Sequence, residues 1–585
     1  MLSGALVAGN YAGPCRILED LLGGRIRYVD AVSGNDNNEG TAKAPWKTIG
    51  KAAITLNAGE SVIVKPGVYR ESIAPRNSGT SEQTRINYIA YDMNNTVISG
   101  ADVLTGWMDG GNGIYYRTWP VAFPQLELAK GDDTPDYVSR QELLIFDGKM
   151  MTPRNTKAEL TDTEVSPATE FFAGGEYWLD VTMSPSRVYA KFPKGMDPAG
   201  HVVEGSVRPT LWRPDKRCDW LRVVGFKFVY AASTRSTQTF ATRFGSNLLI
   251  EENVFLGNNA WGVSLSGNRS TWRGNKILYN GQLGFGGGPN YSTVSFLESA
   301  YNNWKGYDAP YEAGGSKLAG ATDSQFDHLD IHDNLGPGLW FDGGSPGDFN
   351  DGNVVRSSRS YRNMMANYDV ELSSNTSFIN CVAFDAKPIV PPFSTAQDPK
   401  LGAGFYLTRQ TATTLIHCTS YGNSKTGLEV RDYNGRNPPY DNLHNRIYNS
   451  IFAFNRAEEI SLGGDNQAEA RNNELDGNIY WDLNGDLFTV INPRKAGHLF
   501  QGRSIADWRT YTGQDANSQE VDPGLTDRAA IEGWHLSGSS RARGMGVVAP
   551  VPVPDDANGN PRPGRGADVG ADQYVTNLNH TLAIF

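Results

Sequence analysis

The sequence is poor in several features that define common classes of protein. Basic residues are in the minority, since 53 Lys and Arg stand against 64 Asp and Glu and the formal net charge is −11. An acidic chain of this kind is a poor partner for nucleic acid or for an anionic membrane surface. No apolar run approaches the roughly 18 residues that a membrane-spanning helix needs. Nucleic-acid binding and membrane insertion are therefore not expected.

Cysteine is scarce as well, with four residues in a chain of 585. They are too few and too scattered for a disulfide framework. Cys381 and Cys418 occupy equivalent places in the segments FINCVAF and LIHCTSY, so we expect them to stack as small buried residues.

Motifs for metal, phosphate or serine-based chemistry are missing too. No zinc-binding spacing, phosphate-binding loop or serine triad stands out in the sequence. The segment DFNDGN at 348–353 has a composition that calcium loops share, but Asp, Asn and Gly are equally typical of turns. We therefore predict a protein without a metal or other cofactor.

The N-terminal segment 1–25 lacks the pattern of a secretion signal. It contains no basic residue before Arg16 and only a weak apolar stretch. Either a signal has been removed, or the protein reaches the outside of the cell without one.

What the chain does contain is a repeat in its middle. Short stretches of alternating apolar residues close on an asparagine, from IEENVFLGNN to ELDGNIYWDLN, and the shortest repeat is 22 residues long. Most copies carry a second strand-like piece after the asparagine, such as GLWFDG or GLEVRD. A sustained period in the twenties marks a solenoid. The closing positions are Asn258, Asn280, Asn302, Asn334, Asn363, Asp385, Asn423, Asn455 and Asn484.

Each repeat thus holds at least two short strands and no helix, which predicts one coil of a parallel β-helix. A leucine-rich repeat has a similar length, but the sequence lacks the leucine and helix content that it needs. We expect the closing asparagines to be structural, because stacked side-chain amides hydrogen-bond to one another and to the turn backbone.

A helix is predicted before the first coils. Thr48 can cap a helix that runs to about Leu56 and places Ile49, Ala52 and Ala53 on one apolar face. A solenoid needs its open core end covered, and this helix is a natural lid.

The segment around this helix resembles the N-terminal signature of bacterial right-handed parallel β-helix proteins. The chain end, SRARGMG followed by DANGNPRPGRGADVGADQYV, resembles the terminal segment of the same broad pectate-lyase-like group. The resemblance implies an all-β, single-stranded, right-handed β-helix, and many of these proteins are polysaccharide lyases, glycoside hydrolases or tailspikes. The matching N-terminal residues are Tyr28, Asp30, Gly34, Asp36, Gly40, Thr41, Pro45, Trp46, Thr48, Ile49, Ala52, Ala53, Gly59, Val62, Val64, Gly67 and Tyr69.

One part of the chain lacks the repeat. Between about Leu126 and Glu204 the segments YWLDVT and SRVYAKF alternate like antiparallel strands, which predicts a small β-rich subdomain inserted into the helix. The predicted organisation is an N-terminal extension and possible anchor (1–25), a cap with the first coils (26–125), the inserted subdomain (126–205), the main β-helix (206–545) and a closing segment (546–585).

Candidate site residues emerge when the second strands of the repeats are stacked. Aligning their apolar inward residues forces the intervening side chains outward. One outward column is predicted to contain Ser264, Lys317, Trp340, Asp369, Tyr406, Glu429 and Glu459. The neighbouring column is predicted to contain Ser266, Ala319, Asp342, Glu371, Thr408, Arg431 and Ser461.

These columns predict an acidic patch at a place where the repeat is also expanded. Outward positions of any solenoid are polar, so a charged column alone is compatible with a solvated face. Like charges placed opposite one another destabilise a sheet, however, which favours a use for them. The insertions NWKGYDAPYEAGG, DGGSPGDFNDG, DAKPIVPPFSTAQDPK and DYNGRNPPYDNLH are rich in aromatic and small polar residues and would wall a groove that suits sugars.

Paired carboxylates in a sugar-binding groove predict glycoside hydrolysis. One carboxyl group donates a proton to the leaving oxygen, while the other attacks or activates water. We assign this pair to Asp342 and Glu371, with Asp369 and Glu429 as alternates. Substrate binding is assigned to Lys317, Trp340, Tyr406, Arg409 and Arg431.

The rival chemistry is β-elimination on a uronic-acid polymer. It needs a base and a cation that neutralises the carboxylate of the sugar, which Lys317, Tyr406, Arg409 and Arg431 could supply. His328 and His332 are also near in sequence, but His332 falls on an ordinary structural strand. The predicted groove is mainly acidic, which favours hydrolysis.

A second hypothesis is non-enzymatic. The chain could be an adhesin or receptor-binding spike that holds glycans, and the missing signal fits a bacteriophage tailspike because virion proteins leave the cell by lysis. Such spikes resemble this architecture and are usually homotrimers attached to virion tail proteins. In every version the partner is a polysaccharide, and the protein acts outside the cell as a secreted bacterial protein or as part of a virion.

Overall fold

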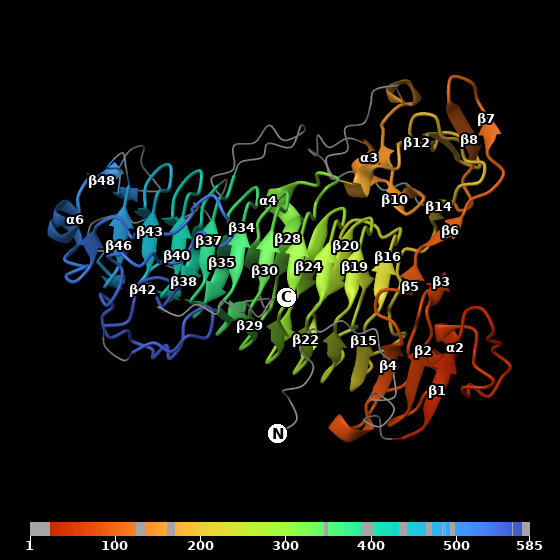
Figure 1. Ribbon diagram of the computed structural model, residues 1–585, viewed down its shortest axis with the longest axis horizontal. Helices are drawn as coiled ribbons and strands as arrows, with labels where there is room; N and C mark the ends of the chain where they lie inside the picture. The colour runs from red at the N-terminus through yellow and green to blue at the C-terminus, as the bar shows by residue number, and fades with distance from the viewer. Residues whose placement is uncertain are drawn as a thin grey trace.

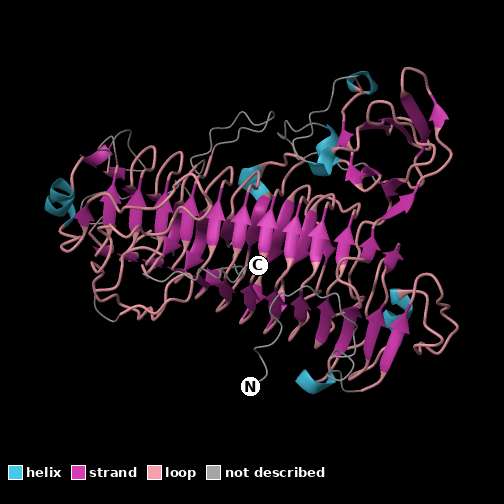
Figure 2. Cartoon of the chain, in the orientation of Figure 1, coloured by secondary structure: helices cyan, strands magenta, loops and turns pink. Residues whose placement is uncertain are grey.

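The computed structural model shows a long solenoid of parallel strands with a smaller antiparallel unit at its N-terminal end (Figures 1 and 2). It describes residues 24–123, 136–160, 170–343, 349–387, 402–431, 442–463, 471–482, 485, 487–491, 498–563 and 566–575.

Each complete coil contributes one strand to each of three stacked sheets, here named A, B and C. The repeat was predicted to hold at least two strands, and the third is the short strand of sheet A that opens each coil. Sheet A contains β1 (Ile26–Val29), β2 (Ser61–Val64), β4 (Ile86–Ala90), β15 (Leu221–Val224), β18 (Leu249–Glu251), β22 (Thr271–Arg273), β26 (Thr293–Ser295), β29 (Gln325–Asp327), β33 (Val354–Arg356), β36 (Ser377–Ile379), β39 (Thr414–Ile416), β42 (Arg446–Tyr448) and β45 (Glu474–Asp476).

Sheet B follows sheet A in every coil. Its strands are β3 (Gly67–Tyr69), β5 (Thr96–Ser99), β16 (Lys227–Val229), β19 (Val254–Leu256), β23 (Lys276–Leu278), β27 (Glu298–Ala300), β30 (Asp330–His332), β34 (Arg359–Tyr361), β37 (Val382–Phe384), β40 (Thr419–Tyr421), β43 (Ile451–Ala453), β46 (Ile479–Trp481) and β49 (Gln519–Glu520).

Sheet C completes the coil and carries the predicted site. Its strands are β17 (Gln238–Phe240), β20 (Trp261–Ser264), β24 (Leu283–Gly287), β28 (Gly314–Leu318), β31 (Leu339–Asp342), β35 (Tyr368–Ser374), β38 (Phe405–Thr411), β41 (Leu428–Arg431), β44 (Ile460–Gly463), β47 (Phe488–Ile491) and β48 (His498–Gly502), with β32 (Asn350–Asp351) paired to β35. A separate short pair joins β21 (Gly267–Asn268) to β25 (Pro289–Asn290).

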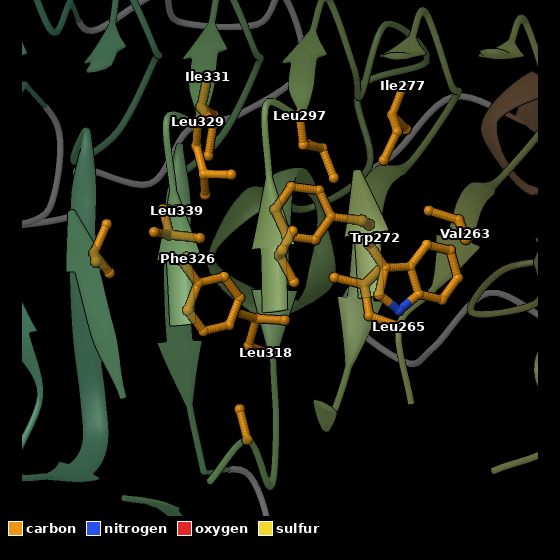
Figure 3. Packing of buried hydrophobic residues seen from close by; sticks show 14 of the residues in the cluster. Val263, Leu265, Trp272, Ile277, Leu297, Leu318, Phe326, Leu329, Ile331 and Leu339 are labelled. Carbon is orange, nitrogen blue, oxygen red and sulfur yellow. The ribbon is translucent and has the colours of Figure 1, made fainter. Parts of the chain in front are cut away.

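The inward side chains of the three sheets form one continuous core. It extends from Val29 to Trp508 and contains Cys381 and Cys418, which are fully buried free thiols in neighbouring coils, as predicted. Figure 3 shows how rings such as Trp272 and Phe326 fill the space between aliphatic residues from the facing sheets. Burying this apolar surface is the main favourable contribution to folding.

The predicted lid is present at the N-terminal end. Helix α2 (Ile49–Thr55) begins after Thr48, whose hydroxyl accepts a hydrogen bond from the Lys51 amide at 3.1 Å. Ile49, Ala52 and Ala53 of this helix are buried in the solenoid core, which confirms the covering role. The other helices in the described residues are α3 (Asp136–Ser139), α4 (Ala309–Glu312) and α6 (Ile505–Thr512), with 3₁₀ turns at Glu82–Thr84, Lys157–Glu159 and Glu170–Phe172.

None of the helices in the described ranges is long and apolar enough to cross a membrane.

The inserted unit lies between the coil of β4 and β5 and the coil of β15 and β16, which pair directly with each other. The unit was predicted to begin at residue 126, but strands before that residue, from β6 onward, also belong to its two sheets. One sheet contains β10 (Lys149–Met150), β9 (Leu144–Phe146), β14 (Val203–Ser206) and β6 (Ala101–Val103). The other contains β11 (Thr152–Pro153), β12 (Glu176–Asp180), β13 (Arg187–Lys191), β8 (Ile114–Thr118) and β7 (Met108–Asp109).

The turns that follow sheet B are held by a ladder of buried asparagines. Asn302 donates from its side-chain amide to Asn334 Oδ1 at 3.0 Å, and its own Oδ1 accepts from both the backbone and the side chain of Asn280 at 3.0 Å. The same contacts recur from Asn258 to Asn363 and between Asn423 and Asn455. The predicted structural role of the closing asparagines is confirmed for these positions, while Asn484 lies outside the described residues.

Asp385 is the exception, and the sequence prediction was wrong there. The ladder position of that coil belongs to Ala386, whose backbone amide donates to Asn423 Oδ1 at 3.1 Å but which has no side-chain amide, and Asp385 points outward to Lys387 at 2.6 Å. Asn367, which lies in the connection between β34 and β35, fills the gap. Its side chain accepts a hydrogen bond from Asn363 at 3.0 Å and donates one to Asn423 at 3.2 Å. The ladder therefore stays continuous although one coil lacks its asparagine.

Connection lengths are uneven around the coil. The turn from sheet A to sheet B always has two residues, as at Glu252 and Asn253, in the coils from β18 to β46. The connections on either side of sheet C vary instead, and the long ones include 301–313 and 385–404 before the sheet and 343–353 and 432–445 after it. All insertions of the main helix therefore flank sheet C.

The chain after β49, here called the C-terminal segment, lies along the outer face of sheet B. His535 contacts Asp572 at 3.2 Å and Glu532 at 3.5 Å, and Glu532 forms an ion pair with Arg359 of β34. Burial alone would lower the pKa of His535, but its hydrogen bonds to Asp572 and Glu532 raise that pKa to about 9. The charged imidazolium thus helps to hold the segment on the sheet.

Removing one rung of the ladder should destabilise the protein. We expect Asn302→Ala to lower the free energy of unfolding by roughly 2–4 kcal/mol, because buried amide and carbonyl groups lose their partners. Urea denaturation of the variant measures this. Asp385→Asn, which keeps a side chain that tolerates the φ of 54° at this residue, is the matched control and should cost less than about 0.5 kcal/mol; equal effects of the two substitutions would contradict the ladder.

The contact of His535 should make stability depend on pH. Because its folded pKa of about 9 exceeds the unfolded value near 6.5, its contribution is complete below about pH 6.5 and is lost as the pH rises through 9. We expect the wild-type protein to lose roughly 2–3 kcal/mol more than His535→Gln between pH 6 and pH 10. Parallel pH profiles of the two proteins in urea denaturation would argue against a stabilising contact of the His535 imidazolium.

Candidate functional site

The outward face of sheet C brings together the residues that the sequence predicted. Trp340 pairs with Asp369, Asp369 with Tyr406, and Tyr406 with Glu429 along one column. In the next column Asp342 pairs with Glu371, Glu371 with Thr408, and Thr408 with Arg431. Lys317 of β28 precedes Trp340 in the first column, because the following residues Leu318 and Phe341 pair. These columns are confirmed.

The last coil departs from the predicted alignment. Glu429 pairs with Ser461 instead of Glu459, so the predicted register of β44 was wrong by two residues. Glu459 precedes the strand, is fully buried and accepts hydrogen bonds from the backbone and side chain of Asn455. It therefore ends the asparagine ladder. Burial raises the pKa of its carboxyl group well above the ordinary value.

Four charged side chains from four adjacent strands form the centre of the site. Lys317 Nζ lies 3.0 Å from Asp342 Oδ2, and Arg409 Nη1 lies 3.2 Å from Glu371 Oε1. The order across β28, β31, β35 and β38 is therefore positive, negative, negative, positive. The two acids thus lie side by side, and each has its own cation on its outer side. The attraction to these cations offsets the repulsion between the two directly paired acids.

Arg409 reaches this face because of a local backbone irregularity. Thr408 points outward, so simple alternation would direct Arg409 into the core. Arg409 has a φ of 47° and its neighbour Leu372 on β35 has a φ of 48°, and left-handed residues of this kind interrupt the alternation of a strand. The side chain of Arg409 consequently turns out toward Glu371.

A second charged group lies at the C-terminal side of the same face. Arg431 Nη1 is 3.2 Å from Glu429 Oε1, and Lys425 forms an ion pair with the other oxygen of Glu429. Lys425 stands in the connection before β41, where no strand pattern points to the site. The sequence therefore gave no signal for it.

Burial distinguishes the four predicted carboxyl groups. Asp369 is 0% exposed and Glu429 is 2% exposed, whereas Asp342 and Glu371 retain 6% and 9%. Asp342 and Glu371 are thus the two that a ligand on this face can reach most directly. They are also the pair that occupies directly opposite positions on adjacent strands, whose spacing is about 4.8 Å.

The predicted aromatic residues Trp340 and Tyr406 belong to the first outward column but are almost fully covered. Trp340 and Tyr406 are 1% and 0% exposed, and the ammonium group of Lys317 lies 4.4 Å from the centre of the Trp340 ring. The Lys317 ammonium also donates to the carbonyl oxygen of Tyr311 at 2.6 Å. Lys317 is therefore fixed by an anion, a ring and a backbone carbonyl at once.

Thr408 is a polar residue of the site that the sequence placed in the second column without assigning it a role. It lies between Glu371 and Arg431 in the same column and is 1% exposed. Its hydroxyl oxygen is buried and makes no hydrogen bond within the part of the chain that the structure describes. A buried hydroxyl of this kind is suited to a hydroxyl group of a ligand.

The histidines considered for elimination chemistry lie elsewhere. His332 is on β30 in sheet B, where its Nδ1 is 2.7 Å from Asp333, and His328 lies in the turn before that strand. Burial would lower the pKa of His332, but hydrogen bonds to Asp333 and Glu298 raise it to about 9. In the described ranges, no cluster of three or more His, Cys, Asp or Glu side chains could hold a metal ion.

Comparison with known proteins agrees with this architecture. Residues 240–390 match the family described as "Right handed beta helix region", and residues 32–76 match the family described as "Protein of unknown function (DUF1565)". A stretch of 80 residues is 37% identical to "Uncharacterized protein YwoF" of Bacillus subtilis (strain 168) and covers 14% of this chain and 17% of that protein. The match thus spans less than a fifth of the relative.

Solved structures extend the likeness to nearly the whole chain. "The complex structure of XylC with xylose" has a TM-score of 0.70 and 17% identity, and the match covers 94% of this chain and 98% of the other. A structure described as "Glycoside hydrolase" has a TM-score of 0.48 and 12% identity over 84% of this chain and 99% of the other. The chain is a right-handed parallel β-helix, a fold found among carbohydrate-active proteins.

The Arg409 and Glu371 ion pair should be coupled to stability. Because both side chains are nearly buried, Arg409→Met should lower the free energy of unfolding by roughly 2–4 kcal/mol, and adding Glu371→Gln should restore part of it. Urea denaturation of the single and double variants tests this. Arg446→Met breaks an exposed pair with Glu474 and should cost less than about 1 kcal/mol; a similarly small cost for Arg409→Met would show that the pair at the site is not held as described.

Proposed function

We propose that the protein hydrolyses glycosidic bonds of a polysaccharide outside the cell, with Asp342 and Glu371 as the catalytic carboxyl pair. The observation that carries this proposal is their direct pairing on β31 and β35, each beside its own cation, on the one face that the variable connections flank. Most glycoside hydrolases use two carboxyl groups that flank the bond to be broken.

The reaction divides two tasks between the pair. One carboxyl group protonates the glycosidic oxygen as the bond to the leaving sugar breaks, and the other stabilises the developing positive charge by attacking the anomeric carbon or by activating water. A substrate bound between the two acids would compete with Lys317 and Arg409 for contacts with the carboxyl oxygens. These cations hold the two carboxyl groups in position.

The remaining predicted residues have supporting roles in this proposal. Asp369 and Glu429 extend the acidic face on either side of Tyr406, and Arg431 orients Glu429. The hydroxyl of Thr408 offers a hydrogen bond to a sugar hydroxyl beside Glu371. Xylose-containing polymers are the first substrates to test, because the similar XylC structure was obtained with xylose.

Hydrolysis is favoured over elimination by the charge balance of the site. Lys317, Arg409 and Arg431 each face a carboxylate of the protein itself at 3.0–3.2 Å. Elimination needs a cation that neutralises the carboxylate of a uronic acid. The cations of this face already serve the acids beside them.

Substitution of the pair tests the proposal. Asp342→Asn and Glu371→Gln should each lower kcat/KM on xylan by about 10²–10⁴-fold, measured as release of reducing ends. Glu474→Gln changes an exposed carboxylate on sheet A and should leave the rate unchanged. Full activity in both site variants would refute the assignment.

An aryl glycoside with a leaving group that needs no protonation separates the two roles. It should restore much of the rate in the variant that lacks the acid and little in the other. Release of products with the ultraviolet absorbance of an unsaturated uronate would instead identify a lyase. Glycan binding without any product would identify a non-catalytic adhesin or spike.

A further inference from the structure

The outer sheet of the inserted unit carries a row of aromatic side chains that the proposed reaction does not use. Trp178 of β12 pairs with Tyr189 of β13, Tyr189 pairs with Tyr116 of β8, and Tyr116 pairs with Met108 of β7. The ring centres of Trp178 and Tyr189 are 5.5 Å apart, and those of Tyr189 and Tyr116 are 5.8 Å apart. The three rings thus follow one another across three strands.

These rings face away from the core of the unit. Their strand neighbours Tyr177, Leu179, Val188 and Ala190 are buried inside it, and alternation places Trp178, Tyr189 and Tyr116 on the opposite face. All three remain partly exposed, and Met108 at the end of the row is 47% exposed. Figure 1 shows β7 and β8 at the outer edge of the unit, away from the stacked coils.

Polar groups accompany the row. The ammonium group of Lys157 lies 4.4 Å from the ring centre of Tyr189, and the guanidinium carbon of Arg187 lies 5.0 Å from that of Tyr116. Cations over aromatic rings are attracted by the negative faces of the rings. The ring faces are therefore partly covered by one another and by these cations, and the row presents ring edges and the uncovered parts of the faces beside hydroxyl, ammonium and guanidinium donors.

The size of the row indicates what can cover it. An aromatic side chain buries about 150–250 Å² when fully covered, so three partly exposed rings offer a few hundred Å² at most. A stable protein interface takes about 800 Å² from each partner. The row is too small and too narrow for a second protein, whereas a line of partly exposed aromatic rings with hydrogen-bond donors beside it suits the C–H groups and hydroxyl groups of successive sugar units.

We propose that Trp178, Tyr189 and Tyr116 form a glycan-binding row that holds a polysaccharide chain apart from the carboxyl pair of sheet C. Binding there keeps the polymer attached to the protein between encounters with the outward face of the coils. The row needs no hydrolysis for its own action, so it can be tested separately from the proposed function.

The experiment uses the full chain carrying Glu371→Gln, so that no polymer is cleaved during binding. Sedimentation with insoluble xylan, cellulose and chitin gives the bound fraction at increasing protein concentration. We expect binding to at least one polymer and an affinity about tenfold weaker after Trp178→Ala or Tyr189→Ala. Trp178→Phe keeps a flat ring and should keep most of the affinity, which separates loss of the ring from loss of folding.

Tyr291→Ala is the matched control. Tyr291 is 57% exposed and has Arg269 at 5.5 Å from its ring centre, so it is a similar exposed aromatic and cation pair on the coils. This variant should bind as the parent protein does. A parent protein that binds none of the three polymers, or an unchanged affinity in Trp178→Ala, would overturn the proposal.

Two further measurements distinguish glycan binding from a role in the reaction itself and from self-association of the protein. In the otherwise native chain, Trp178→Ala should slow the hydrolysis of insoluble xylan and leave that of a xylo-oligosaccharide unchanged; an equal loss on both would place the row in the reaction itself and overturn the proposal. Concentration-dependent self-association that Trp178→Ala abolishes in light scattering would make the row a contact between copies of the chain and overturn it as well.

Discussion

The structure depends on one constraint, which is that side-chain amides buried between coils are costly unless they find hydrogen-bond partners in the neighbouring coils. The amides from Asn258 to Asn363 and from Asn423 to Asn455 meet this constraint, and each rung joins one coil to the next at a fixed height and rotation. A slip between coils would leave several buried amides without partners at once. The ladder therefore sets the register of all three sheets as well as the turn in which it lies.

The candidate site is a product of that register. Asp342 and Glu371 meet because β31 and β35 are stacked without a shift, and Lys317 and Arg409 flank them because β28 and β38 are the next strands on either side. None of the four residues is close to another in sequence. A like-charged pair is tolerable at the centre of a sheet because the cations offset its repulsion.

The ladder also shows how such a scaffold tolerates a defect. The coil with Ala386 lacks an amide at the critical position, and Asn367 reaches the gap from the connection before β35. At the far end, the carboxyl group of Glu459 replaces the next asparagine. Both substitutions preserve the hydrogen bonds while changing which residue supplies them. The constraint acts on the contacts, so different side chains can satisfy it.

Much of the fold and part of the site follow from periodicity alone. The alternation of apolar residues predicted the columns that contain Asp342, Glu371, Asp369 and Glu429, because period two and a constant coil leave little freedom. The same reasoning failed at Glu459, where an acid before the strand resembles an outward residue of the strand itself. Glu429 and Ser461 pair because the apolar residues Ile460 and Leu462 face inward, and a shift by two residues preserves that alternation equally well.

Other features depend on geometry that no sequence pattern carries. The outward turn of Arg409 comes from a left-handed residue within a strand, and the aromatic row of the inserted unit comes from the pairing of the β12–β13 hairpin with β8, which lies much earlier in the chain. The ion pairs of Lys317 and Lys425 depend on how long side chains extend over the surface. These are properties of three-dimensional neighbours, which become visible only when the strands are placed.

Because the long connections lie beside only one sheet, the surface there can change without a change in the stacked coils. The two-residue turns between sheets A and B leave no room for insertion, whereas the connections beside sheet C have accepted segments as long as 385–404. Length can therefore be gained or lost there without moving a rung of the ladder or a core residue. A protein with this architecture can exchange the segments around one face, and so change what that face binds, while every coil beneath keeps its place.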